Sequence, residues 1–366
     1  MFLKNSKSFS ALSFSIFLAI AGAARAQYSP TGPGVGAASS PSFPNGSQKA
    51  SSEATGVERN GVYEETEVKH SWFSFTKPAE KTPEAEFERA EKFRAAGDFK
   101  SAGRAFYALT ITWPRAPQAA VAQQRYAEML AAREKFEDAF EQFDRLIDRY
   151  LGSFDYTAII EAQFGIAQKI MSQRKGKVLL FGGFKAPERA IPLFESILKH
   201  APRWPGAPEA QYLIGVANEM IGEYDLAVVA YMNTQHRYPD SQFAEKASFG
   251  RAHCLYLITQ ENPNDPDALE QAYAGAVVFL NAFPQSDHAD LAIAYKETLL
   301  RKREEVAYGR GVFYEKVAHQ PKAALMSFEA FVAMYPNSPW TPSAKERIES
   351  LRISAGKSKV NKNDET

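Results

Sequence analysis

The chain has 366 residues, 45% of them hydrophobic and 23% charged, which is typical of a globular protein of one to three domains. Lys and Arg number 43, as do Asp and Glu, and this balance argues against a nucleic-acid-binding protein. The single cysteine, Cys254, excludes an internal disulfide and any multi-cysteine metal site. Its position beside Leu255 in a predicted helix favours a buried, inert thiol.

Residues 1–26 have the pattern of a signal peptide. Lys4 and Lys7 give a positive start, the run 11–20 is apolar, and Ala24-Arg25-Ala26 offers a cleavage site before Gln27. The apolar run is short for a membrane span. We therefore expect an exported protein, located in a Gram-negative periplasm at the inner face of the outer membrane.

Residues 27–82 are predicted to be a tether rather than part of the fold. The first part, 27–60, is rich in Gly, Pro, Ser and Ala and nearly lacks side chains that could form a core. An aromatic stretch follows at 68–78 and includes Trp72, Phe73 and Phe75. Two interpretations are open: a lead-in that packs on the first helix, which the pattern favours, or an extended segment that docks on the helical body or on a partner.

From Pro83 onward the sequence alternates between helices and short turns. Apolar positions at helical spacing end at Gly97-Asp98, resume at Phe99 and end again at Trp113-Pro114. A helix, a Gly-Asp-Phe turn, a second helix and a proline form the pattern of a tetratricopeptide repeat (TPR), whose period is about 34 residues. Small residues such as Ala102, Ala139 and Ala227 occupy positions where the two helices of a hairpin are expected to approach closely.

A recurring Pro motif marks the end of most of the second helices. The clearest copies place an aromatic residue before Pro and a polar residue after it, as in Tyr238-Pro239-Asp240-Ser241, Phe283-Pro284-Gln285-Ser286 and Tyr335-Pro336-Asn337-Ser338. Pro lacks a backbone donor and disfavours the helical conformation in the residue before it, so the helix should end there. The polar residues are predicted to cap the next helix.

Two insertions make the repeat spacing irregular. One is a Gly-flanked apolar segment at 175–184, and the other is a loop at 261–266. Insertions in repeat arrays collect in loops, often on the binding side. A loop that only covers the end of a hairpin is the other interpretation, and the pattern favours it for both.

The last third is predicted to contain a long helix over 290–308, a segment at 312–316, and a helix that ends at Tyr335-Pro336. The final helix, 343–353, is expected to cap the array, and 354–366 to form a frayed tail. The fold class is therefore all-α: a right-handed superhelical TPR solenoid of about five to six helix pairs over 83–353, with a C-terminal capping helix.

No catalytic, metal-binding or cofactor-binding motif stands out, so the protein is not expected to be an enzyme. His253 and Cys254 are adjacent and about 100° apart on a helix, so they are not expected to face one site. Gly182-Gly183 is not followed by the Lys-Ser/Thr of a phosphate loop. Neither an H-E-x-x-H motif nor paired cysteines occur.

The predicted function therefore depends on a protein-binding surface. The concave side of a TPR solenoid is lined by the first helix of each pair, and grooves of this kind bind extended or helical segments of partners. The predicted groove residues are polar side chains on those helices: Gln123, Arg125, Gln163, Asn218 and Arg251.

The C-terminal half resembles a known family. The matching residues are, in chain order, Phe283-Pro284-Gln285-Ser286, Ala289, Arg301-Lys302-Arg303, Val312-Phe313-Tyr314-Glu315-Lys316, Ala323-Ala324 and Tyr335-Pro336-Asn337-Ser338. This order of a long helix, a Phe-Tyr helix start and a Tyr-Pro-x-Ser helix end is similar to the BamD (YfiO) family, the TPR component of the outer-membrane β-barrel assembly machine.

The resemblance implies a non-enzymatic scaffold that binds barrel-assembly proteins or unfolded outer-membrane clients, with no small-molecule substrate and only indirect membrane contact. It also implies that Arg301, Lys302 and Arg303 contact the barrel-inserting partner. The family is usually lipid-anchored through a Cys after the signal peptide, whereas Gln27 stands here, so no lipid is expected. The alternative is a periplasmic TPR adaptor of the Tol-Pal type, which coordinates envelope constriction or peptidoglycan synthesis.

Overall fold

The computed structural model describes residues 77–175 and 184–363. The predicted leader, most of the tether with residues 68–76, and residues 176–183 of the first insertion lie outside this part. Thirteen α-helices occur in the described residues, and none of them is long and apolar enough to cross a membrane. Their bounds are α1 Pro83–Ala95, α2 Phe99–Thr112, α3 Ala119–Ala132, α4 Phe136–Arg149, α5 Tyr156–Ser172, α6 Ile191–His200, α7 Ala207–Met220, α8 Tyr224–Arg237, α9 Gln242–Glu261, α10 Pro266–Ala282, α11 Ala289–Lys316, α12 Pro321–Met334 and α13 Thr341–Asn363.

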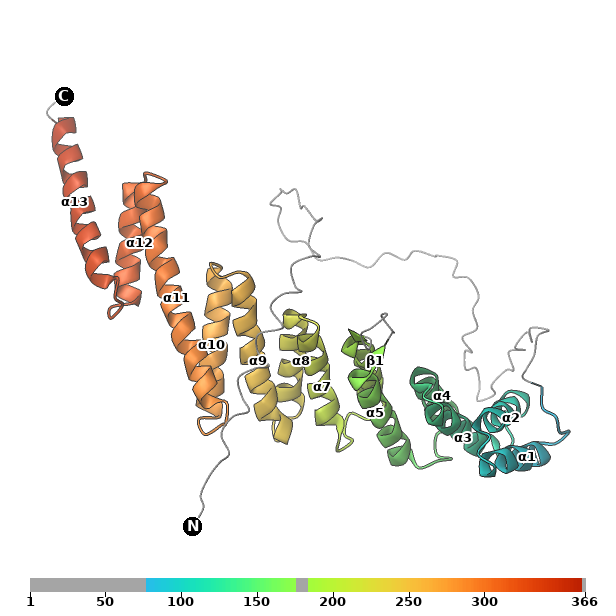
Figure 1. The fold of residues 1–366 in the computed structure, drawn as a ribbon. Helices are drawn as coiled ribbons and strands as arrows, with labels where there is room; N and C mark the ends of the chain where they lie inside the picture. Colours follow the sequence, from blue (N-terminus) through green and yellow to red (C-terminus); the bar gives the residue numbers. More distant parts are fainter. Residues whose placement is uncertain (1–76, 176–183, 364–366) are drawn as a thin grey trace, which may run out of the picture. The chain divides into compact units, whose positions relative to one another are not determined.

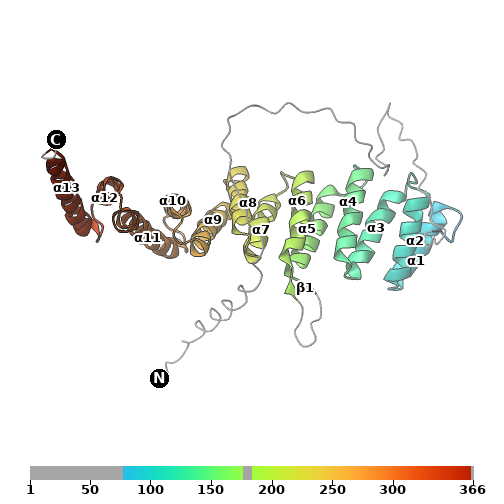
Figure 2. The same cartoon turned by 90° about the horizontal axis from the view of Figure 1, so that it is seen from above.

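The helices form an array in which each packs on its neighbours in sequence (Figures 1 and 2). Six consecutive pairs, from α1–α2 to α11–α12, are followed by α13 in the described part of the chain. The all-α TPR fold predicted from the sequence, with its terminal capping helix, is thereby confirmed. The only β-structure among the described residues is a two-stranded antiparallel ribbon, β1 (Arg174–Lys175) with β2 (Phe184–Lys185), which brackets the first insertion. The 3₁₀ helix η1 (Pro187–Ala190) then leads into α6.

The Pro motif ends the second helices as predicted. The residues that close α2, α6, α8, α10 and α12 each stand directly before a proline and leave the helical conformation: Trp113, Ala201, Tyr238, Phe283 and Tyr335. The predicted capping role of the next polar residues is wrong for Ser241, the N-cap of α9. Its side chain accepts no capping bond, and its hydroxyl instead donates to the Tyr238 carbonyl at 2.9 Å.

Several of the turns inside the hairpins contain a residue in the left-handed conformation. Gly97 (φ 76°) and Gly222 (φ 81°) supply it after α1 and α7, where a side chain would be strained. In the α3–α4 turn, Glu134 takes this conformation at φ 58°. Glycine is common in this predicted turn because it adopts the left-handed conformation without strain. Another residue can take that conformation, so glycine is not needed in every repeat.

The long helix α11 differs from the prediction. It runs unbroken from Ala289 to Lys316, so Phe313 and Tyr314 lie near its end and do not start a new helix. The two glycines before them do not break it, because a glycine lowers helix propensity by only about 1 kcal/mol and α11 packs on both α10 and α12. Gly311 faces α12, where the Phe328 ring occupies the space that a Cβ would fill. Helix α13 likewise extends past Ile353 to Asn363, into the expected tail, because no proline stops its propagation.

Alanines and large aromatic residues fill the hairpin interfaces. Ala102, Ala139, Ala227 and Ala324 are fully buried, as expected for positions of close helix approach. Phe106 and similar large side chains from the second helices fill the space between pairs. Each pair therefore buries its apolar stripe mainly against its sequence neighbours, which is the packing logic of a repeat array.

Two tyrosines connect successive pairs in an equivalent way. The Tyr150 hydroxyl donates to the Pro114 carbonyl, and the Tyr238 hydroxyl donates to the Pro202 carbonyl; both bonds measure 3.0 Å and both span 36 residues. In each case a tyrosine at the end of a second helix is bonded to the loop that follows the second helix of the previous pair. The 36-residue separation is close to the TPR period of about 34 residues.

The Tyr231 side chain connects three helices. Its ring is fully buried between α7 and α9, and its hydroxyl donates to Glu219 Oε2 at 2.6 Å. A Cβ on Gly215 of α7 would lie 2.5 Å from the ring, and one on Gly250 of α9 would lie 2.7 Å from it. Both distances are too short for real carbon contacts, so glycine is required on both sides of this ring.

We predict that Gly215→Ala and Gly250→Ala each destabilise the protein, because the added methyl group forces the Tyr231 ring out of its place. Overpacking of this kind typically costs about 1–3 kcal/mol. The matched control is Gly165→Ala in α5, where nothing lies within 4 Å of the new Cβ. That control should be neutral or stabilising by up to about 1 kcal/mol, since Ala favours a helix over Gly. Urea unfolding measures the difference, and equal midpoints for all three variants would contradict the packing argument.

Candidate docking site on the C-terminal helices

The three consecutive cations on α11 do not form one patch. Arg301 is exposed, and its Nε donates to the Glu297 carbonyl of the same helix at 3.5 Å. Lys302 pairs with Glu305 on the same helix at 3.1 Å. Both Arg301 and Lys302 line a pocket that also includes Trp340. Arg303 faces a different pocket, so α11 separates the predicted contact residues.

Arg303 connects α11 to α10. Its guanidinium forms an ion pair with Glu270 and lies 4.4 Å from the centre of the Tyr273 ring. The Arg303 side chain is only 16% exposed, so its charge is already neutralised within the chain. A cation–π contact combined with an ion pair identifies Arg303 as a residue that joins α11 to α10 and thereby the last helix pair to the one before it.

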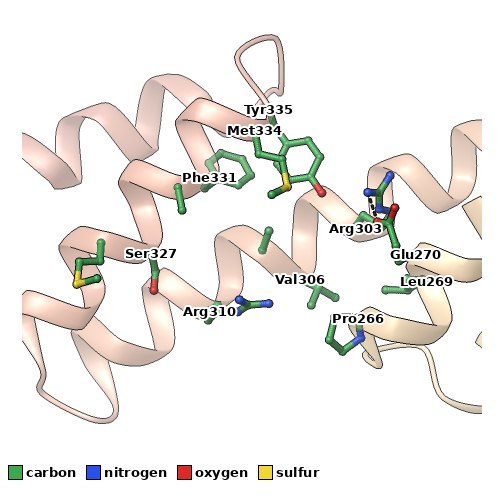
Figure 3. Close-up of a pocket in the computed structure, with 13 residues that line it drawn as sticks. Pro266, Leu269, Glu270, Arg303, Val306, Arg310, Ser327, Phe331, Met334 and Tyr335 are labelled. Carbon is green, nitrogen blue, oxygen red and sulfur yellow. Dashed lines mark hydrogen bonds and ion pairs between the residues drawn. The ribbon is translucent and has the colours of Figure 1, made fainter. Parts of the chain in front are cut away.

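The pocket that Arg303 faces is the candidate docking site, which we call the C-terminal groove (Figure 3). It has a volume of about 320 Å³ and lies between α10 and α12, over α11. Its lining residues are Pro266, Leu269 and Glu270 of α10, Arg303, Val306, Ala307 and Arg310 of α11, and Met326, Ser327, Ala330, Phe331, Met334 and Tyr335 of α12 and its cap.

Two methionines make this groove adaptable. Met326 is 70% exposed and Met334 66% exposed, although both lie beside the buried Phe331. Methionine has a flexible, polarizable side chain that adjusts to apolar partners of different shape. Exposed methionines at the edge of a groove are therefore a surface suited to an apolar segment of another protein.

Arg310 provides a charge at the same groove. It is exposed, and no hydrogen bond or ion pair joins it to another residue in 77–175 or 184–363. It can therefore bind a carboxylate of a partner without first losing an internal one. Arg310 and Met326 were not predicted from the sequence. The signal for Met326 is a spacing of four residues to Ala330 and again to Met334. These three positions lie outside the buried stripe of Ala324, Phe328 and Phe331.

The polar residues predicted on the first helices have internal contacts in this structure. Gln123 is buried and donates to Gln142 of α4 at 3.1 Å, Gln163 is buried and donates to Asp144 Oδ1 at 2.6 Å, and Asn218 is buried and donates to the Ile214 carbonyl at 2.9 Å. Burial raises the pKa of the Asp144 carboxyl, and the Gln163 bond opposes this shift. These three side chains therefore satisfy buried polar groups.

Arg125 and Arg251 are half-buried and lie apart from the α11 cations. Arg125 pairs with Glu128 at 2.7 Å on its own helix and lies 3.7 Å from Glu91 of α1. The Arg251 Nε is buried without a hydrogen-bond partner among the described residues. A partner-binding role for these five residues stays a prediction, and the structure does not bring them together with Arg301, Lys302 and Arg303.

His253 and Cys254 lie near one carboxylate, contrary to the sequence-based expectation. His253 Nε2 lies 3.8 Å from Glu219 Oε1, and burial together with the same carboxyl group raises the pKa of the Cys254 thiol. Glu219 belongs to the neighbouring helix α7. His253 Nδ1 also lies 2.8 Å from the Tyr295 hydroxyl of α11. The cluster is a structural connection, and no group of metal-binding side chains occurs among the described residues.

The stacked helix pairs define the class of protein: a helical-repeat protein of the TPR type, a class of scaffold that offers extended surfaces to other proteins. The resemblance to the BamD (YfiO) family is confirmed over residues 207–357, which match the YfiO family model, described as "Outer membrane lipoprotein". This stretch includes α7 to α12, the first part of α13 and the whole C-terminal groove.

Several solved structures are similar to this chain. A tetratricopeptide repeat protein from Parabacteroides merdae ATCC 43184 is 14% identical and covers 74% of this chain and 98% of its own, with a TM-score of 0.28. A thermophilic TPR protein from Thermus thermophilus is 19% identical and covers 60% of this chain and 100% of its own, with a TM-score of 0.25. No curated protein matches the chain.

We predict that Arg303→Ala lowers stability whereas Arg301→Ala does not. Loss of the Tyr273 contact and the Glu270 pair should cost about 1 kcal/mol, since Glu270 is exposed and its ion pair is weak. Arg301→Ala removes an exposed side chain and should stay within about 0.5 kcal/mol. Urea unfolding measures both. A larger loss for Arg301→Ala would show that the assignment of the two arginines is reversed.

We also predict that Cys254 is unreactive in the folded protein. Burial, together with the Glu219 carboxyl, raises the pKa of the Cys254 thiol well above its usual range, so little thiolate forms at pH 8. Reaction with a thiol reagent should be slow in native buffer and fast in guanidinium chloride. The control is Ser350→Cys in a Cys254→Ser background, because Ser350 is exposed. Equally fast reaction of the two thiols in native buffer would contradict the burial argument.

Proposed function

We propose that this chain is an exported, non-enzymatic TPR scaffold that acts at the inner face of the outer membrane and helps to assemble β-barrel proteins. The observation that carries the proposal is the match of residues 207–357 to a family described as outer-membrane lipoproteins. The TPR architecture supports it, because repeat arrays offer extended surfaces for partner proteins.

In this proposal the C-terminal groove binds the barrel-assembly partner. The groove lies entirely within the matched residues and combines exposed methionines with the exposed cation Arg310. An apolar segment with a carboxylate beside it would complement both features. Arg301, on the other side of α11, is the second candidate contact, whereas Arg303 is best left unchanged because its substitution would disturb the contact between α10 and α11.

We expect Arg310→Glu to reduce co-purification of a barrel-assembly protein with the tagged chain from cells of its own bacterium, with an unchanged melting temperature. The measurement is cross-linking followed by affinity purification and quantitative mass spectrometry. A matched control is the double reversal Arg104→Glu with Arg149→Glu, since both residues are exposed and lie on α2 and α4, outside the matched segment.

The outcomes separate the alternatives. Loss of the partner with Arg301→Glu, but not with Arg310→Glu, moves the contact to the other side of α11. Recovery of Tol or Pal components in place of barrel-assembly proteins supports the adaptor role that the sequence left open. Retention of a barrel-assembly partner by both single variants contradicts the proposed contact.

A further inference from the structure

A second groove lies between α6 and α8, outside the C-terminal helices. It has a volume of about 530 Å³ and is lined by residues of α6, α7 and α8. We call it the α6–α8 groove. Its position is equivalent to that of the C-terminal groove, since both lie between the second helices of adjacent pairs, over the first helix of the later pair. The array thus repeats one kind of depression at two places.

The part of the α6–α8 groove near the start of α8 is apolar. Leu226 is 57% exposed and Val229 is 55% exposed, although both belong to a helix with a well-buried opposite side. Ile191 of α6 lies across the groove, and Ile214 of α7 belongs to its floor. Two branched aliphatic side chains left half in water on one helix indicate a surface that a further apolar group covers.

The other end of the groove is positively charged. Lys199 lies in the last turn of α6 and Arg237 in the last turn of α8. These two ends lie close together, because the Tyr238 hydroxyl donates to the Pro202 carbonyl just beyond them. No hydrogen bond or ion pair connects Lys199 or Arg237 to another residue of the described ranges. Glu195, one turn before Lys199, is the acidic group of the lining, so the end of the groove keeps an excess of positive charge.

We infer that the α6–α8 groove binds an amphipathic helix of a partner protein, with its apolar side against Leu226 and Val229 and an acidic end against Lys199 and Arg237. A helix in a groove between two helices uses anchors spaced three or four residues apart, which suits the length of this apolar surface. Charge complementarity then fixes the direction in which the partner helix lies. The inference does not depend on the proposed role in barrel assembly.

The test uses the full-length protein and a labelled, helix-forming peptide with Leu at spacings of three and four residues and Glu at one end. Fluorescence anisotropy should show binding that weakens at high salt. The double variant Lys199→Glu with Arg237→Glu should lower the affinity for this peptide by at least about tenfold, and should raise the affinity for the same peptide with Lys in place of Glu. The matched control is Arg149→Glu with Lys169→Glu, two cations on α4 and α5 that lie outside the groove.

A second pair of measurements tests the apolar part. Leu226→Gln with Val229→Thr should lower the affinity for the acidic peptide without changing the melting temperature, since both side chains are largely exposed. A peptide of the same composition in scrambled order should bind at least about tenfold more weakly. Equal binding of the two peptides, or equal affinity of the charge-reversal variant and the wild type, would overturn the inference. So would a concentration-dependent dimer of the protein that Leu226→Gln with Val229→Thr abolishes, because a second copy would then be the occupant.

Discussion

The α7–α9 junction depends on the Tyr231 ring and on the two glycines that make room for it. Consecutive helices of a repeat array contact mainly their neighbours, so each junction must be stable without support from distant residues. Here α8 places one large ring between Gly215 and Gly250, and the hydroxyl at its tip satisfies Glu219. Glu219 in turn lies 3.8 Å from His253 of α9, so one aromatic side chain and one carboxylate connect the fourth helix pair to the fifth.

The helix ends could be predicted from the sequence because their causes are local. A proline excludes the helical conformation from the residue before it whatever surrounds it, so Tyr238, Phe283 and Tyr335 close their helices as expected. The continuity of α11 could not be predicted, because two glycines close together suggest a break locally, whereas packing on α10 and α12 comes from distant residues. The role of Ser241 could not be predicted, because its hydroxyl has two local choices: to accept from the start of α9, or to donate to the Tyr238 carbonyl three residues earlier, as it does here.

The surface was harder to predict than the fold. Gln123 and Gln163 are polar, and a hydrophobicity pattern assigns them to the outside, yet each is buried because a polar partner lies across the helix interface. Conversely, Met326 and Leu226 are apolar and exposed. Which side of a repeat helix is buried depends on where the next helix pair packs against it. That position is set by the packing of the whole array and cannot be read from one helix.

The bonds from Tyr150 to Pro114 and from Tyr238 to Pro202 have a consequence for how such an array changes in evolution. In both, the acceptor is a backbone carbonyl, so the earlier repeat contributes no particular side chain. A duplicated repeat that carries its own closing tyrosine would find the same acceptor on whichever repeat precedes it. This one connection can therefore form again after a whole repeat is gained or lost, whereas a junction such as the one around Tyr231 would need its own glycines.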